Sequence, residues 1–314
     1  MSPSTIPFLL HLAPLSPSEI PAHPSIPYSS PSSASDGAID ARPSLSLFLH
    51  AALTQARDFI ATTVPGESFT TDRKLYDSPP SSTPVQISSG TVKYTPLASK
   101  NPATPQKEDK WFARRTVLDN RTTMGNASFQ EFVEGLKDSH LMNEMEYEPN
   151  ITAVEDIAKW DCSGVEVEGG WSGVGASLSL VTHTFQPASV ISPRVFLAMV
   201  ITAFTPPEPP TSTTPSAFIN IQLPIHVSAI RPALPLPKNA VLGKYVSVEM
   251  VRVLADADDA AGPGKIEWRM ATSSQAGGWI PRFLQHSSIP NAIAKDVGLF
   301  LKWVDERRAK KAGR

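Results

Sequence analysis

Cysteine, charge and long apolar runs are scarce in this chain of 314 residues. Cys162 is the single cysteine, so an internal disulfide is excluded and a reducing compartment suits the protein. Charged residues make up 18% of the chain, the net charge is −2, and the one basic run is residues 307–311, which disfavours a nucleic-acid binder. No apolar run reaches the roughly 18 residues that span a membrane. The apolar stretch 6–13 lacks the basic residue that precedes a signal sequence. We therefore expect a cytoplasmic protein.

The residue sets that mark metal, nucleotide and catalytic sites are missing as well. Cys162 has no companion cysteine and no nearby histidine. The glycine-rich stretch 169–175 lacks the lysine of a phosphate-binding loop and the spacing of a nucleophile elbow, so it predicts a tight hairpin. His183 and His226 fall in expected strands without a recognisable nucleophile or orienting partner. The sequence thus predicts no metal, no cofactor and no catalytic residue.

Proline, in contrast, is abundant, and its 31 residues divide the chain. Residues 1–43 are rich in proline and serine without periodicity, which predicts a disordered leader. Residues 44–308 hold the periodic patterns of one ligand-binding domain, and a basic tail follows at 309–314. Three Pro-x-x-Pro segments lie in the leader, at 14–17, 21–24 and 24–27. They suggest, as one alternative, an interaction scaffold.

Helical and strand periodicities alternate through the folded part. Apolar residues recur at helical spacing from Leu45 to Ile60, and Ser128 and Glu131 form a capping box before a short helix. Strands are predicted at 67–76, 85–95, 111–118, 151–162, 165–171, 177–186, 194–204, 217–227, 244–254 and 265–273. A last amphipathic helix is expected over 281–308, with a kink at Ser288–Pro290. This order predicts an α+β fold with a curved antiparallel sheet wrapped around the long C-terminal helix, and a cleft between them suited to an apolar ligand.

Motifs in the final third resemble those of START lipid-transfer domains. Ile191–Phe196 is similar to a Ser-Pro-Arg-Asp-Phe stretch of that family, and Gly277–Pro281 to the Gly-Gly-x-Ile-Pro start of its last helix. The chain most resembles the fungal START-like group called domain of unknown function 3074. The resemblance implies a helix-grip fold and a hydrophobic ligand. Val195 and Gln275 stand where the family often has aspartate, so contacts of those carboxylates do not carry over.

Strand alternation selects the candidate ligand-binding residues. The charged residues of 265–273 alternate with Trp268 and Met270, which places these two in the cleft. Similar reasoning turns Met250 inward and brings Arg252 with it. Arg252 is then either an anchor for a headgroup or carboxylate, or a strand-end arginine that pairs with a local carboxylate or reaches water. Four residues of the last helix face the sheet: Phe283, Ile293, Val297 and Phe300. The apolar members of this set either line a cavity or form ordinary core.

We therefore expect a monomer that binds, and transfers or senses, a lipid or other hydrophobic small molecule without covalent chemistry. Its partners would be that ligand and, transiently, a membrane surface. A cyclase-like enzyme that acts on an apolar polyketide or terpenoid remains an alternative beside the scaffold. The polar groups available to such an enzyme are Arg252, His183 and His226.

Overall fold

The computed structural model describes residues 6–26, 28, 42–95, 105–185, 191–207, 214–227, 236–254, 264–278 and 282–313, except the side chains of 282–286. The helices are α1 (Leu45–Asp58), η1 (Phe59–Thr63, a π-helical turn), α2 (Phe129–Phe132), η2 (Val133–Lys137, also π-helical), α3 (His140–Tyr147) and α4 (Arg282–Ala312). The strands are β1 (Phe69–Tyr76), β2 (Val85–Tyr94), β3 (Lys107–Asp119), β4 (Ile151–Trp160), β5 (Ser172–His183), β6 (Arg194–Phe204), β7 (Ala217–Pro224), β8 (Val241–Leu242), β9 (Lys244–Leu254) and β10 (Lys265–Gln275).

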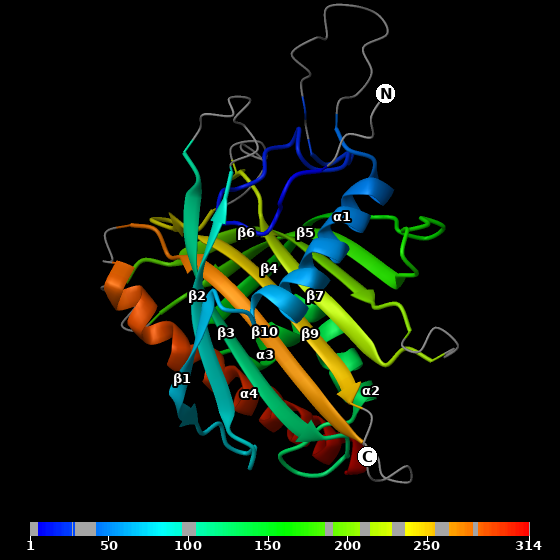
Figure 1. Ribbon diagram of the computed structural model, residues 1–314, viewed down its shortest axis with the longest axis vertical. Helices are drawn as coiled ribbons and strands as arrows, with labels where there is room; N and C mark the ends of the chain where they lie inside the picture. Colours follow the sequence, from blue (N-terminus) through cyan, green and yellow to red (C-terminus); the bar gives the residue numbers. More distant parts are fainter. Residues whose placement is uncertain are drawn as a thin grey trace, which may run out of the picture.

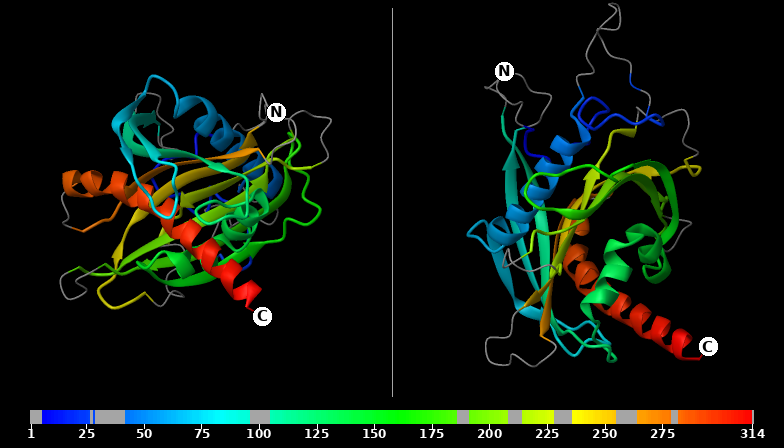
Figure 2. Two further views of the ribbon diagram at one scale, coloured as in Figure 1. Left: turned by 90° about the horizontal axis from the view of Figure 1, so that it is seen from below. Right: turned by 90° about the vertical axis from the view of Figure 1, so that its right-hand side faces the viewer.

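All strands in the described part of the chain belong to one sheet of ten strands, in the order β1-β2-β3-β10-β9-β7-β6-β5-β4, with β8 beside β6. Every pair on this path is antiparallel, whereas β8 runs parallel to β6. The sheet lies between two helical layers (Figures 1 and 2). α1 and η1 contact β6, β7, β9 and β10 on one face, while α2, η2, α3 and α4 cover the other. The predicted α+β helix-grip architecture is confirmed.

α1 forms because its apolar residues lie on one stripe and its start is capped. The Ser44 hydroxyl accepts a hydrogen bond from the Leu47 amide, which satisfies a free donor of the first turn. The buried stripe comprises Phe48, Leu49, Ala52, Leu53 and Ala56. The capping box of Ser128 and Glu131, which was predicted, starts α2.

Residues 6–26 pack against the sheet on the α1 side. Leu9, Leu10, Leu15 and Ile20 are each at most 1% exposed and belong to the core beneath α1. The Leu15 amide donates to the Pro224 carbonyl (2.8 Å), and the Leu15 carbonyl accepts from the His226 amide (2.8 Å). The prediction of a disordered leader is therefore wrong for these residues. The Pro-x-x-Pro segments 14–17 and 21–24 lie within this packed stretch.

Two further element predictions need correction. Residues 165–171 form a loop and no strand, because Gly164, Gly169 and Gly170 adopt positive φ angles that interrupt extended backbone. At the C-terminal end, α4 runs from Arg282 to Ala312, so most of the predicted tail 309–314 is helical.

α4 continues through Pro290 and changes direction along its length (Figure 2). Proline removes a helical amide donor, which explains a bend at this point. The Gly-Gly-x-Ile-Pro motif lies partly outside the described residues. No helix in the described part of the chain is both long and apolar enough to cross a membrane.

Candidate functional site

A small polar cavity lies between the sheet and the helices α3 and α4. Its volume is about 50 Å³. It is lined by Arg114, His140, Glu144, Tyr147, Glu148, Asn220, Gln222, Tyr245, Ser247, Glu249, Trp268, Met270 and Asp296. Six different elements or their ends supply these side chains, which are far apart in the sequence.

Strand register brings the central residues together. Arg114 of β3 lies directly opposite Met270 of β10, and Met270 lies opposite Glu249 of β9. Residues opposite each other in antiparallel strands point to the same face, so these three side chains form a row beneath α3 and α4.

An ion pair between Arg114 and Glu249 occupies the centre of the cavity. The Arg114 Nη2 atom lies 3.0 Å from Glu249 Oε1, and the two side chains are 2% and 9% exposed. The Trp268 indole donates to the same oxygen at 2.7 Å, and the Arg114 guanidinium lies 4.0 Å from the centre of the Trp268 ring. These contacts offset part of the several kcal/mol that burial of two charges costs.

Several polar atoms around this pair have no hydrogen-bond partner among the described residues. They are Nε and Nη1 of Arg114, Nδ1 of His140 and Oδ1 of Asn220. Asn220 is fixed by its amide donor, which reaches the Leu136 carbonyl at 2.7 Å. Buried polar groups are normally paired, because each unpaired one costs about 1–3 kcal/mol. The cavity therefore presents both donors and acceptors to whatever enters it.

Acidic groups outnumber the cations in this cavity. Burial, with the nearby charge of Glu249, raises the pKa of Glu144 to about 8. Burial also raises the pKa of Asp296 to about 7, although Arg114 opposes the shift. Burial lowers the pKa of His140, which keeps its ring neutral. Two carboxyl groups can thus hold protons near neutrality. Among the described residues, no group of three or more His, Cys, Asp or Glu side chains is placed to hold a metal ion.

The apolar space beside the polar cavity is filled by packed aromatic rings. Phe300 of α4 is fully buried and stacks on Phe132 with ring centres 5.0 Å apart. It also meets the ring of Trp268 at 5.2 Å and that of Tyr147 at 5.8 Å. The space that remains, about 50 Å³, is large enough for a small polar group but too small for an acyl chain. A larger ligand therefore requires α4 or α3 to move away from the sheet.

The sequence prediction placed some of these side chains correctly. Trp268 and Met270 line the cavity. Ile293, Val297 and Phe300 are buried in the same core cluster as Trp268, so they face the sheet as predicted. The side chain of Phe283 lies outside the described residues.

The prediction was wrong for the face of Met250 and Arg252. Trp268 lies opposite Val251, whereas Met250 is opposite Arg269 and Arg252 is opposite Glu267. Both predicted residues therefore point to the α1 side of the sheet. The Nε atom of Arg252 donates to Glu267 at 2.6 Å, in agreement with the alternative that it pairs with a local carboxylate.

Neither histidine that was considered for catalysis lines the cavity. His183 packs at 5.2 Å against Phe196, and burial lowers its pKa to about 4. The residues that sequence reasoning missed are Arg114, Glu249, His140, Glu144 and Asp296. A signal existed for two of them, because Arg114 and Glu249 are charged residues inside apolar strands.

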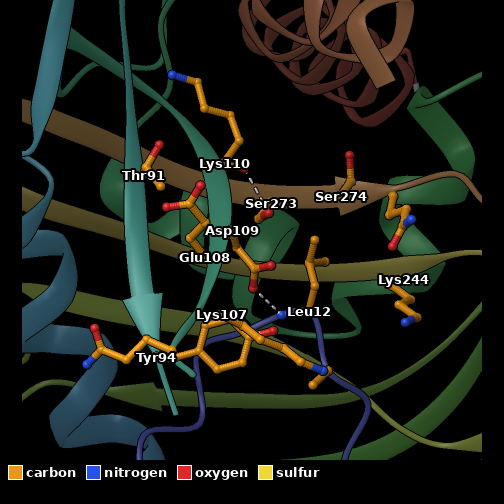
Figure 3. Close-up of a pocket in the computed structure, with 13 residues that line it drawn as sticks. Leu12, Thr91, Tyr94, Lys107, Glu108, Asp109, Lys110, Lys244, Ser273 and Ser274 are labelled. Carbon is orange, nitrogen blue, oxygen red and sulfur yellow. Dashed lines mark hydrogen bonds between the residues drawn. The ribbon is translucent and has the colours of Figure 1, made fainter. Parts of the chain in front are cut away.

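A larger, open cleft lies where β3 and β10 separate (Figure 3). Their pairing ends at Phe112 and Thr272, although both strands continue beyond these residues. The cleft measures about 710 Å³ and is lined mainly by charged and hydroxyl-bearing residues. The Leu12 amide donates to Asp109 across it at 2.7 Å, and the Ser273 hydroxyl donates to the Lys110 carbonyl at 2.8 Å. This lining does not suit an apolar ligand, so the small cavity beneath α3 and α4 is the better candidate site.

Comparison with known proteins agrees with this architecture. The chain matches the family model described as "Protein of unknown function (DUF3074)" over residues 111–304, more than half of its length. No curated protein matches it. Its structure is similar to the crystal structure of human STARD10, with a TM-score of 0.51, 12% identity, and 83% of this chain and 84% of that chain covered. It is also similar to human StAR-related lipid transfer protein 5, with a TM-score of 0.50, 12% identity, and 83% and 96% covered. The chain thus belongs to the DUF3074 family and has a START-like helix-grip fold.

Proposed function

We propose that this protein binds a lipid or another hydrophobic small molecule with a polar end, held between the sheet and α4. The observation that carries the proposal is the polar cavity between the sheet and the helices α3 and α4, in which Arg114 has two nitrogen atoms without a partner among the described residues. The structural likeness to human StAR-related lipid transfer protein 5 supports the same class of ligand.

The chemistry of the cavity favours the polar end of such a ligand. The free donors of Arg114 suit a carbonyl, hydroxyl or oxyanion acceptor. Asn220 Oδ1 and the surrounding carboxyl groups suit a hydrogen-bond donor of the ligand. A ligand that satisfies these atoms removes their desolvation penalty, which gives binding a driving force beyond apolar contact.

The apolar end would take the place of the aromatic rings around Phe300. α4 must then move as the ligand enters, and two anchors resist that movement. The Ser78 hydroxyl accepts from the Gly298 amide at 2.7 Å, and Arg308 binds Glu131 at 2.7 Å. Binding and release without covalent change would make the protein a carrier or sensor. We further propose that it acts as a cytoplasmic monomer with transient contact to membranes.

Uptake of a fluorescent phospholipid from phosphatidylcholine vesicles tests this function. Arg114→Lys keeps the positive charge beside Glu249 but removes the two unpaired nitrogen atoms. Charge-assisted hydrogen bonds contribute about 1.5–3 kcal/mol each, so we expect uptake to weaken at least tenfold. Arg121→Lys, in an exposed loop, is the matched control and should behave as the wild type. Equal uptake by all three proteins, or no uptake by any, would contradict the proposal.

A second candidate function is an enzyme that uses the same cavity. The observation in its favour is that Glu144 and Asp296 have pKa values of about 8 and about 7, which suit proton transfer at neutral pH. Small molecules extracted from purified wild-type and Glu144→Gln proteins would distinguish the two functions. Retention of a different compound by the variant would indicate a blocked reaction. Recovery of the same compound from both proteins would support binding without a reaction.

A further inference from the structure

Three arginines converge on one buried carboxylate on the α1 side of the sheet. Glu267 is 2% exposed and accepts from Arg115 Nε at 2.6 Å, Arg252 Nε at 2.6 Å and Arg269 Nη2 at 2.9 Å. We call these four residues the arginine cluster. It lies on the opposite face from the proposed ligand cavity, so it does not depend on the function of that cavity.

Strand register builds the arginine cluster. Arg115 of β3 lies opposite Arg269 of β10, and Arg252 of β9 lies opposite Glu267 of β10. Neighbouring strands are about 4.8 Å apart, so the four side chains share a compact patch. Arg269 reaches the Ile60 carbonyl of η1 at 3.4 Å, which places the patch at the border of the helical cover.

The arginine cluster carries surplus positive charge. Three guanidinium groups face one carboxylate, so the local sum is +3 − 1, or +2. Burial acts to raise the pKa of Glu267, but the three arginines outweigh it and hold that pKa below its usual value. Within the described ranges, no other carboxylate forms an ion pair with Arg115, Arg252 or Arg269.

The unused donors of the cluster are partly open to solvent. The side chains of Arg115 and Arg252 are 45% and 42% exposed. Each uses Nε to bind Glu267, and neither terminal nitrogen has a partner in the described part of the chain. Glu267 thus restrains two guanidinium groups while their outer nitrogen atoms stay available. The N–H donors of a guanidinium group form a planar fork, and a restrained fork is the side-chain group that best matches an oxyanion.

We propose that the arginine cluster is a binding site for a phosphate monoester. A phosphate monoester carries a charge of about −1.5 to −2 at pH 7, which matches the surplus of the cluster, and its three oxygens can accept from both forks. The ester can belong to a soluble phosphorylated metabolite or to a phosphorylated lipid headgroup.

Isothermal titration calorimetry of the full chain with glycerol 3-phosphate tests this site. We expect saturable binding that weakens as the pH falls from 7.5 to 5.5, because the phosphate then loses its second charge. The Arg115→Gln/Arg252→Gln variant should bind at least a hundredfold more weakly. Arg73→Gln/Arg121→Gln changes the net charge equally at exposed positions outside the cluster and should bind as the wild type. Loss of binding in both variants, or in neither, would overturn the proposal.

A second variant keeps the test valid if the glutamine variant does not fold. Arg115→Lys/Arg252→Lys retains the charges that neutralise Glu267 but lacks the forks, and should bind glycerol 3-phosphate about tenfold more weakly. Unchanged affinity in this folded variant would refute recognition by the forks.

Vesicles distinguish the two sources of the ester. Phosphatidylcholine vesicles containing phosphatidylinositol 4-phosphate are compared with vesicles that carry equal charge as phosphatidylserine. Selective binding to the first assigns a lipid headgroup, whereas binding to the soluble ester alone assigns a metabolite. Absence of binding to both phosphate-bearing probes would refute the site.

Discussion

At the scale of single residues, Glu249 connects two parts of the cavity wall, since it forms an ion pair with Arg114 and accepts a hydrogen bond from Trp268. Glu249→Ala leaves a buried guanidinium without its counter-charge, which should lower the free energy of unfolding by about 3–5 kcal/mol. Glu249→Gln keeps an oxygen that accepts a hydrogen bond from Trp268, so it should lower the free energy of unfolding by a smaller amount. Urea unfolding measures both values. An alanine variant with the wild-type unfolding midpoint would show that the ion pair is not the centre of the site.

Asp296 makes stability depend on pH. Its pKa of about 7 in the folded protein lies above the value of 3.8 for a free aspartate. The folded state therefore keeps a proton that the unfolded state releases, and the free energy of unfolding should fall as pH rises from about 4 to about 7. Glu144 acts in the same direction. Asp296→Asn should flatten this decline in urea unfolding at several pH values, while an unchanged decline would exclude Asp296 as its source.

At the scale of elements, the contact between α4 and the turn after β1 depends on Gly298. A Cβ atom at this position would overlap the carbonyl oxygen of Pro79 and lie 2.9 Å from the Ser78 hydroxyl. Gly298→Ala should therefore displace α4 and lower stability by about 1–3 kcal/mol. Gly313→Ala, at the open end of α4, provides the matched control. Thermal unfolding compares the two variants. Equal melting temperatures would mean that α4 does not need this close approach.

Most strands were predictable from the sequence, apart from the false strand 165–171, but the faces of β9 were not. In β10, Lys265 and Arg269 marked one face correctly. In β9, both faces carry valines, because helices cover both sides of the sheet at this strand. Alternation distinguishes faces only where one of them meets water. This is why Met250 and Arg252 were assigned to the wrong side, and why Arg114 and Glu249 were missed.

At the scale of the whole molecule, the packed segment 6–26 is part of the fold. Its proline content suggested disorder, yet Leu9, Leu10, Leu15 and Ile20 are apolar residues that are buried in the core beneath α1. Each such side chain contributes about 1.5–3 kcal/mol when buried. Deletion of residues 1–26 should therefore lower the free energy of unfolding by several kcal/mol in urea titration. A truncated protein as stable as the full chain would restore the interpretation of a dispensable leader.

The fold class and the C-terminal helix followed from periodicity and motif resemblance, because both depend on local sequence. The cavity depends on residues of β3, α3, β7, β9, β10 and α4 that only the folded chain brings together. Its small volume also depends on how tightly Phe300 packs, which the sequence does not encode locally.

Native mass spectrometry of the full chain, purified from a eukaryotic host, tests the central claim most directly. The account predicts a protein species with one bound lipid-sized molecule, which Arg114→Lys carries less often than Arg121→Lys. Detection of the bare protein mass alone, also after incubation with lipid vesicles, would contradict a ligand site between the sheet and α4.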